Sequence, residues 1–432
     1  MKKTLSLVLI LVMVIGMFVG CTSNESVNPT NTDQSSSEPS DPKFDGVIKM
    51  GAVLPLTGPS AESGIACKQG LLIGEAEVNA AGGIKIDGKS YEVKIIMEDD
   101  AGSPDQSVSA AEKLLTKDGV SVLFTGCLSS SSLAIMDICD KYPDVLFTTI
   151  ECTSDNFSKI ISENPERYFN FYKPYYGSTD YGAAFGEFVA DMSEKGIIDF
   201  SNKTVAYMVE DTDAGRSVIP ACEAALEKFC GGSTTVAVEV VPQGHTDFYS
   251  QINKFKSLDP DVVLTFFVPL NSGVAYVKQT KEIGTEWTDV AIVYPLKAGF
   301  IEQTGQNSEG LFWFPQQADF ENNPEVKAFA EKVYETFPDA GLNAMHVSSY
   351  IGVGMVKEAI EKAGTTNARD GLAEAYGNLD YQSINGRYVF KDDHTSLAGP
   401  DYLAITVAQV QDQHSNVVWP ENAAFSEPVP QK

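Results

Sequence analysis

The 432-residue sequence is poor in basic side chains and in metal ligands. It has 31 lysines and arginines against 59 aspartates and glutamates, which gives a formal charge of −28. A general surface for nucleic acid or anionic lipid is therefore excluded, because such surfaces need an excess of cations. The four histidines stand apart in the sequence and no CxxC pair occurs, so we expect no metal site.

The motifs of common enzyme classes are also missing. The chain has no HExxH, no GxSxG nucleophile elbow and no P-loop, and no GxGxxG follows its first predicted strand. The acidic pair Asp99-Asp100 falls at a strand-to-helix turn, where carboxylates usually cap and orient a loop. We therefore expect a protein that is not an enzyme and that uses no cofactor.

The chain has one long hydrophobic run, and it is short for a membrane span. Leu5–Val19 has 15 residues, whereas a spanning helix needs about 20. Lys2 and Lys3 precede it as a positive segment. The pattern predicts a signal peptide over residues 1–20, with a signal-anchor helix as the alternative.

The segment Phe18-Val19-Gly20-Cys21 resembles the lipobox of bacterial lipoproteins. The resemblance implies that Cys21 is lipidated and becomes the first residue of an exported protein, anchored at the outer face of the cytoplasmic membrane. Residues 22–42 are rich in Ser, Thr, Asn and Pro and lack hydrophobic periodicity. We expect residues 21–45 to form the lipidated N-terminus and a flexible tether.

From residue 46 onward, short apolar strands alternate with helical segments, which predicts α/β architecture with parallel sheets covered on both faces. The strands are expected over 47–54, 91–99, 120–125, 146–150, 204–210, 236–241 and 262–267. The helices are expected over 64–81, 104–118, 130–141, 180–196, 215–229, 248–257 and 272–283. A polar stretch over 172–180 predicts two sheets in succession, with ligands at the carboxyl ends of their strands.

Several loop motifs, in their order and spacing, resemble those of branched-chain amino-acid-binding proteins, the type I periplasmic binding proteins of ABC importers. They are Gly51-Ala-Val-Leu-Pro-Leu-Thr-Gly-Pro59, Asn79-Ala-Ala-Gly-Gly-Ile84, Glu98-Asp-Asp-Ala-Gly-Ser-Pro104, Gly126 with the run Ser129–Ser132, Thr153, Thr246-Asp-Phe248 and Pro260-Asp-Val-Val263. The resemblance extends from about residue 47 to about residue 410.

The resemblance implies two doubly wound parallel-sheet lobes, joined by three crossovers, with a ligand cleft between them. Lobe one is expected to comprise 46–172 and 297–384, lobe two 173–296 and 385–420, and a C-terminal tail 421–432. The implied function is capture of a small solute that bears a carboxylate or an amide, most simply an amino acid, by lobe closure. A monomer then delivers the solute to an ABC importer permease. The alternative is a ligand-sensing module that reports to a separate signalling partner.

A carboxylate site is expected at Ser129–Ser132, between a strand end and a helix start. Hydroxyls and unpaired N–H groups at the positive end of a helix suit a carboxylate, although one of these serines is also expected to cap the helix. By the resemblance, Ser130 and Thr153 hold the ligand carboxylate, with Ser129 and Glu151 beside them. Ser63 stands where related proteins place a ligand-covering side chain.

The partner of a ligand ammonium group is less evident. Ala214 replaces a tyrosine of the family pattern, and Val293-Tyr-Pro-Leu-Lys297 has no carboxylate where leucine-binding relatives have a Glu. Either Glu151 or Asp213 binds the ammonium, or the ligand has none; for Asp213, helix capping is the alternative role. Phe267 and Tyr294, at strand ends, are candidates for an aromatic wall.

Six cysteines remain beside Cys21, and an exported protein permits disulfides among them. Six cysteines allow 15 pairings, and the sequence does not choose among these. Cys222 and Cys230 are too far apart for a disulfide if one helix carries both. We expect at least one pair to be buried free thiols.

Overall fold

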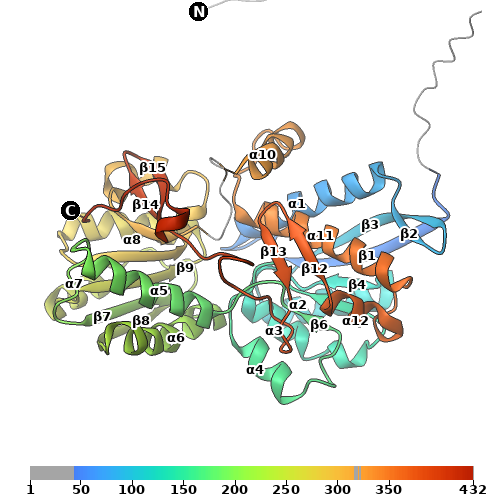
Figure 1. Cartoon of the computed structure of the whole chain (residues 1–432), viewed down its shortest axis with the longest axis horizontal. Coiled ribbons are helices and arrows are strands. Elements are labelled where there is room, and N and C mark those ends of the chain that lie inside the picture. The colour runs from blue at the N-terminus through green and yellow to red at the C-terminus, as the bar shows by residue number, and fades with distance from the viewer. Residues whose placement is uncertain (1–42, 316–319, 321–322, 432) are drawn as a thin grey trace, which may run out of the picture. The chain divides into compact units, whose positions relative to one another are not determined.

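The computed structural model describes residues 43–315, 320 and 323–431 (Figure 1). The predicted signal peptide, the lipidated Cys21 and the tether up to residue 42 lie outside these residues. Within them, no helix combines the length and the hydropathy that crossing a membrane requires.

The first lobe is built on a six-stranded sheet with the order β2-β3-β1-β4-β5-β6. Neighbouring strands are parallel except β2 and β3, which form an antiparallel pair. The bounds of the strands are β1 Gly46–Leu54, β2 Ile84–Ile86, β3 Lys89–Asp99, β4 Val122–Phe124, β5 Leu146–Thr148 and β6 Phe171–Tyr172.

Successive side chains of a strand point to opposite faces of the sheet, and both faces of this sheet are buried. Met50 and Ala52 belong to the hydrophobic cluster that includes residues of α1 (Ala61–Ala80) and α11 (Ala344–Ala363). Val53 belongs to the cluster on the other face. The helices of that second face are α2 (Pro104–Lys113), α3 (Ser129–Met136) and α4 (Asn156–Glu163).

The second lobe is built on a seven-stranded sheet with the order β15-β14-β11-β10-β9-β7-β8. Strands β7 to β11 run parallel, and β14 and β15 extend the sheet in antiparallel fashion. The bounds of the strands are β7 Thr204–Glu210, β8 Thr234–Val241, β9 Val262–Phe267, β10 Thr288–Val293, β11 Phe312–Phe314, β14 Val407–Gln411 and β15 His414–Trp419.

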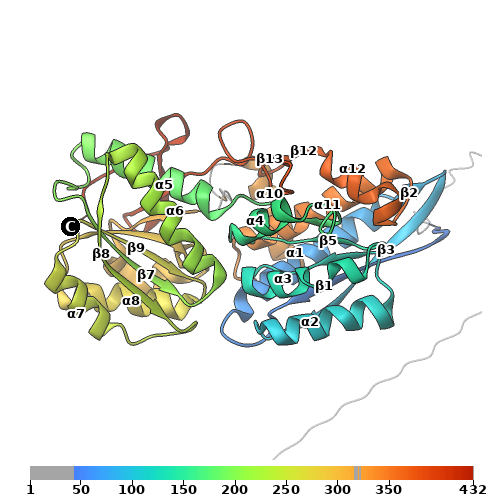
Figure 2. The ribbon, with the colours of Figure 1, turned by 90° about the horizontal axis from the view of Figure 1, so that it is seen from below.

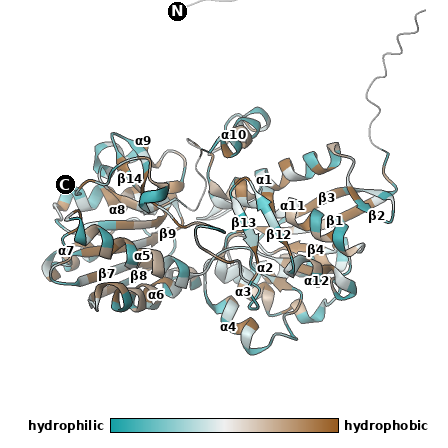
Figure 3. Ribbon diagram, in the orientation of Figure 1, coloured by the Kyte–Doolittle hydropathy of each residue, from teal (hydrophilic) through white to brown (hydrophobic). Residues whose placement is uncertain are grey.

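Helices cover both faces of the second sheet as well. Figure 2 shows α5 (Ser178–Glu194) and α6 (Asp213–Cys230) on one side of β7 to β9, with α7 (Tyr249–Leu258) and α8 (Leu270–Ile283) on the other. In Figure 3 the helices carry both hydrophobic and hydrophilic residues, as expected for helices with one face against a sheet.

The remaining elements follow β10 in the sequence, and the alternating pattern did not predict them. They are the helices α9 Phe300–Thr304, α10 Pro324–Thr336 and α12 Ala373–Gly377, and the hairpin of β12 Asp380–Ser383 with β13 Gly386–Val389. In the described part of the chain, the backbone passes between the sheets three times: between β6 and β7, between β11 and α11, and between β13 and β14.

Two of the expected lobe boundaries are wrong. The boundary at residue 297 is too early, because β11 pairs with β10 and β14 in the second sheet. The boundary at residue 385 is also too early, because β13 pairs with β12 and Thr395 bridges to Lys173 at the end of the first sheet. These long-range pairings leave no local signal in the sequence.

The C-terminal residues described by the structure lie against the second lobe. The Gln409 side chain exchanges two hydrogen bonds with the backbone of Val429, at 2.7 and 2.9 Å. The backbone N–H of Asp289 donates to the Gln431 side chain at 2.8 Å. The predicted tail is therefore held along the sheet by backbone and amide hydrogen bonds.

Candidate functional site

A cavity of about 180 Å³ lies where the carboxyl ends of the two sheets face each other. Four predicted site residues line it from the first lobe: Ser129, Ser130, Glu151 and Thr153. The second lobe contributes Asp211, Thr212, Gln243, Phe266, Val268 and Val293. The site thus combines a polar wall on one lobe with a partly apolar wall on the other.

Ser129 joins two first-lobe loops at the start of α3. Its Oγ accepts hydrogen bonds from the backbone N–H groups of Thr153 and Ser154, both at 3.2 Å. The helix begins at Ser129, and its N-cap residue is Leu128, which makes no side-chain capping bond. The expectation that one serine caps this helix is therefore wrong, and the positive end of α3 lies uncapped beside the cavity.

Ser130 is a point of contact between the two lobes. Its Oγ accepts a hydrogen bond of 3.1 Å from the backbone N–H of Asp213, at the start of α6. A hydroxyl that accepts in this way keeps its own O–H to donate. Ser130 can therefore donate to an anion in the cavity while it remains bonded to the second lobe.

Glu151 lines the cavity, and one of its two carboxylate oxygens has no hydrogen-bond partner. The residue is 4% exposed, and its Oε1 accepts a short hydrogen bond from the Ser348 hydroxyl. Its Oε2 is buried and has no hydrogen-bond partner. Burial raises the pKa of Glu151 to about 7, against the lowering effects of Ser348 and the Lys297 charge. A buried, half-satisfied carboxylate of this kind suits a cationic group.

Asp213, the alternative partner for an ammonium group, is not among the residues that line this cavity. Its carboxylate accepts a 3.2 Å hydrogen bond from the Asn156 side chain. Asp213 lines a separate groove between α4 and α6. The structure therefore brings its backbone, and not its carboxylate, to Ser130.

Phe267 and Tyr294 do not form the expected aromatic wall. Both are fully buried in the second-lobe core, with ring centroids 5.4 Å apart. The Tyr294 hydroxyl is 2.9 Å from Thr265 Oγ1. Side chains alternate along β9, so Phe266 lines the cavity and Phe267 faces α7 and α8.

Ser63 is likewise not one of the cavity-lining residues. It is 1% exposed and accepts a 2.5 Å hydrogen bond from the ammonium group of Lys297. Lys297 follows the short 3₁₀ helix Tyr294–Leu296 that comes after β10, and it is 3% exposed. The stretch after β10, which has no carboxylate, thus carries a buried lysine.

Glu210 is a buried carboxylate near the cavity that the sequence analysis missed. It is the last residue of β7, and it accepts hydrogen bonds from the backbone N–H groups of Gly244 (3.3 Å) and Val268 (3.0 Å). Burial raises its pKa to about 7. Both oxygens are used to position loops, so Glu210 is not available for a ligand. The position of Glu210 at the end of a buried strand was the one feature of the sequence that could have indicated a role in positioning loops.

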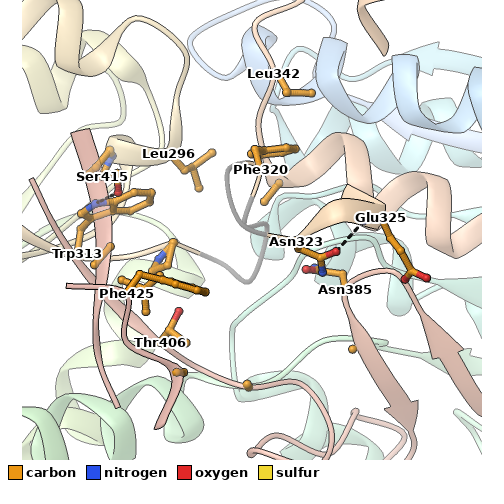
Figure 4. A pocket seen from close by; sticks show the side chains of 18 of the residues that line it. Leu296, Trp313, Phe320, Asn323, Glu325, Leu342, Asn385, Thr406, Ser415 and Phe425 are labelled. Atoms are coloured by element: carbon orange, nitrogen blue, oxygen red, sulfur yellow. Dashed lines mark hydrogen bonds between the residues drawn. The ribbon is translucent and has the colours of Figure 1, made fainter. Parts of the chain in front are cut away.

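A larger cavity of about 870 Å³ is lined by other segments (Figure 4). Leu296, Trp313 and Phe425 give it apolar walls, and Glu325 is the one charged residue among the described residues that line it. The Ser415 hydroxyl there already accepts from the Trp313 indole at 3.0 Å. Because none of the predicted site residues reaches this cavity, the smaller one is the candidate site.

The described cysteines are all free thiols, five of them buried and Cys230 partly so. Helix α6 carries both Cys222 and Cys230, so the condition under which the two are too far apart for a disulfide is met. Among the described residues, no group of three or more His, Cys, Asp or Glu side chains is placed to hold a metal ion.

Comparisons with known proteins identify a family that covers most of the chain. The family model described as "Periplasmic binding protein" matches residues 47–414. Leu/Ile/Val-binding protein homolog 3 of Brucella melitensis is 26% identical over 328 residues, which are 76% of this chain and 82% of the relative. The leucine-, isoleucine-, valine-, threonine- and alanine-binding protein of Pseudomonas aeruginosa is 25% identical over 360 residues, covering 82% and 88%.

Solved structures show the same fold at lower sequence identity. The branched-chain amino acid transporter substrate-binding protein of Streptococcus pneumoniae, in complex with isoleucine, has a TM-score of 0.69 and 19% identity, covering 87% of this chain and all of that chain. A solute-binding protein of R. palustris in complex with benzoate has a TM-score of 0.72 and 17% identity, covering 90% and 98%. On the extent of the family match, the chain belongs to the periplasmic binding protein family of solute-binding proteins.

Proposed function

We propose that the chain captures a small α-amino acid with an apolar side chain in the cavity between its lobes. The observation that carries the proposal is the pairing of an uncapped helix start with the unpartnered Glu151 oxygen in one cavity. The first is a receptor for a carboxylate, and the second is a receptor for an ammonium group. A ligand that carries both a carboxylate and an ammonium group can bind to the helix start and to Glu151 at once.

In this proposal Ser129, Ser130 and Thr153 bind the ligand carboxylate, and Glu151 Oε2 accepts hydrogen bonds from its ammonium group. The apolar wall of Phe266, Val268, Val293 and Met345 is left for the side chain. The names of the Brucella and Pseudomonas relatives list branched-chain amino acids, which supports this choice. An aromatic acid such as benzoate would leave the buried Glu151 oxygen without a partner, at a cost of about 1–3 kcal/mol or more.

The mechanism we propose is lobe closure over the ligand, followed by presentation of the closed form to an ABC importer. Ligand favours closure only by the amount by which it binds the closed form better. We propose that the protein acts outside the cytoplasm as a monomer without catalysis, held at the membrane through a lipidated Cys21. A sensor that reports to a signalling partner would use the same closure.

Calorimetric titration with a panel of amino acids, aromatic acids and amides tests the proposal. We expect Ser130→Ala and Thr153→Ala each to lower the affinity for L-leucine by about 10-fold or more, since each removes a hydrogen bond to a charged group. Ser109→Ala, on exposed α2 of the same lobe, is the matched control and leaves affinity unchanged. Binding confined to ligands without a carboxylate would contradict the assignment.

A further inference from the structure

The larger cavity, of about 870 Å³, has the dimensions of a ligand site, and the proposed function does not use it. Sites for small organic ligands usually measure about 300–1,000 Å³ and combine mostly apolar walls with a few polar groups. Leu296, Trp313 and Phe425 line this cavity from the second lobe, and Leu342 and Asn385 line it from the first. In Figure 4, Trp313 and Phe425 lie on one side of the cavity and Asn385 lies on the other.

Asn385 is a buried carboxamide in the wall of this cavity, and it has no partner among the described residues. The residue is 8% exposed, and neither its Oδ1 nor its Nδ2 makes a hydrogen bond. Burying polar atoms without partners is costly, so such atoms usually have a partner in the functioning protein. The side chain thus offers a hydrogen-bond acceptor and a donor next to each other.

The turn that carries Asn385 does not account for its free side chain. Asparagine is common in turns because its side chain bonds to nearby backbone or because it tolerates a positive φ, and Asn385 has neither property. The backbone of the turn, which connects β12 and β13, is satisfied by other groups. The Asn385 N–H donates to Ser383 Oγ at 3.0 Å, and the Ile384 carbonyl accepts from the Asn323 side chain at 2.9 Å. These bonds fix the turn and leave the Asn385 amide without a partner.

Asn323, which lines the same cavity, shows what a structural asparagine looks like. It caps α10: its Oδ1 accepts from the backbone N–H groups of Glu325 and Val326, at 2.9 and 3.2 Å. Its Nδ2 donates to the Ile384 carbonyl. Both ends of the Asn323 amide therefore support the fold, whereas both ends of the Asn385 amide are available to a ligand.

The charge at the cavity narrows the chemistry of that ligand. Glu325 is the one charged residue among the described residues that line it, so an anionic ligand is disfavoured. An ammonium group has donors only and could not accept from the Asn385 N–H. A primary carboxamide is neutral and has a C=O and an N–H on the same edge. It can therefore pair with both ends of the Asn385 amide at once.

We propose that this cavity is a second ligand site, for a neutral molecule with an apolar body and a primary carboxamide that pairs with Asn385 through two hydrogen bonds. The Asn385 Nδ2 donates to the ligand carbonyl, and the ligand N–H donates to Oδ1. The apolar body lies against Leu296, Trp313 and Phe425. Phe425 is 60% exposed, so the ligand covers aromatic surface that would otherwise face water.

Calorimetry at pH 7 with 4-phenylbutanamide tests the inference on the complete folded chain. We expect the parent to bind this amide at least about 10-fold more tightly than 4-phenylbutanoate, which is ionised and has no N–H. N-Methyl-4-phenylbutanamide is expected to bind more weakly as well, because a trans amide has its C=O and N–H on opposite edges. These three ligands are compared on the parent alone, so the result does not depend on how a variant folds.

A variant then assigns the binding to Asn385. Asn385→Leu, which keeps the approximate size of the side chain, is expected to lower the affinity for 4-phenylbutanamide by about 10-fold or more, because it removes both hydrogen bonds. Its urea unfolding midpoint is expected to be no lower than that of the parent, because an apolar side chain replaces an unpaired buried amide. Asn253→Leu, at an exposed position of α7, is the matched control and leaves the affinity unchanged.

The Ser130→Ala variant separates this inference from the proposed function. The two cavities share no lining residue among those described, so Ser130→Ala is expected to bind 4-phenylbutanamide as the parent does. The inference would be overturned if the parent did not bind the amide or bound the carboxylate equally well. Loss of amide binding in Ser130→Ala but not in Asn385→Leu would also overturn it. Failure of the parent to bind L-leucine would instead overturn the proposed function alone.

Discussion

At the scale of single residues, two buried carboxyl groups near the cavity differ in what they bind. Glu210 accepts two backbone N–H groups, whereas Glu151 has one oxygen without a partner. A carboxylate satisfied by the protein positions loops, and one left unsatisfied is available to a ligand. The difference depends on partners that are distant in sequence, so the sequence pointed to Glu151 by resemblance alone and missed Glu210.

The free oxygen of Glu151 has a measurable cost in the unliganded protein. Its pKa in the folded chain, about 7, lies above the ordinary value of 4.5. The stability that the neutral form provides is complete below about pH 4.5 and is lost as the pH rises through about 7. We expect Glu151→Gln to raise the free energy of unfolding at pH 8 by roughly 1–3 kcal/mol and to change little at pH 5.

Urea unfolding of the unliganded chain at both pH values measures this difference. Glu286→Gln, at an exposed position, is the control and is expected to be neutral at both. A Glu151→Gln variant that is less stable than the parent at pH 8 would show that the carboxylate is satisfied in a way the structure does not contain.

At the scale of elements, α1 and α11 pack so closely that the backbone of α11 lies directly against Gly70 of α1. A Cβ atom added at Gly70 would lie 2.2 Å from the carbonyl oxygen of His346 and from Ser349 Oγ. A Cβ at Gly352 would meet the Phe124 ring at 3.2 Å, where a small shift suffices. The close approach at Gly70 lets α1 and α11 together cover one face of the first sheet.

We therefore expect Gly70→Ala to destabilise the chain by roughly 1–3 kcal/mol, because overpacking outweighs the better helix propensity of alanine. Gly352→Ala is the matched comparison in α11 and is expected to cost less. Urea unfolding midpoints measured at constant slope distinguish the two. Equal or higher stability of Gly70→Ala would contradict the packing between these helices.

The elements also show what the sequence can predict. Strands such as β1 and β9 are largely apolar, interrupted only by Lys49 and Thr265, and local pattern is enough to find them. Whether a residue at the end of a strand faces the cavity or the core depends on the register of that strand. Phe266 lies in the cavity wall, and its neighbour Phe267 lies in the core. Helix α3 starts at Ser129 without a capping serine, and the Ser129 hydroxyl instead accepts from the backbone N–H groups of Thr153 and Ser154. No local motif encodes these partners.

At the scale of the whole molecule, hydrogen bonds join the lobes beside the cavity. The Ser130 and Asp213 contact is one of them, and the Asp155 N–H donates to the Ser217 hydroxyl at 3.1 Å. The Gln243 side chain donates to Ser60 Oγ at 3.0 Å. Ser130 also lines the cavity. In the proposed binding mode, the ligand carboxylate and the second lobe would share its hydroxyl, which would couple binding to closure.

The polar stretch over 172–180 and the family resemblance predicted the two lobes, but the lobe boundaries depend on pairings across long sequence separations. Strand β11 joins the second sheet through β10 and β14, and Thr395 lies beside Lys173. These pairings depend on which edge strand of a sheet is still unpaired. That edge is defined only after the other strands have assembled.

The proposed function depends on one cavity binding both the carboxylate and the ammonium group of an α-amino acid. Its most direct test is calorimetry at pH 8 with three compounds that share a side chain: L-leucine, 4-methylpentanoate and isopentylamine. We expect leucine to bind at least about 100-fold more tightly than either compound lacking one charged group, and Glu151→Gln to reduce this advantage over 4-methylpentanoate by about 10-fold or more. Equal affinities for leucine and 4-methylpentanoate, unchanged by Glu151→Gln, would contradict the account.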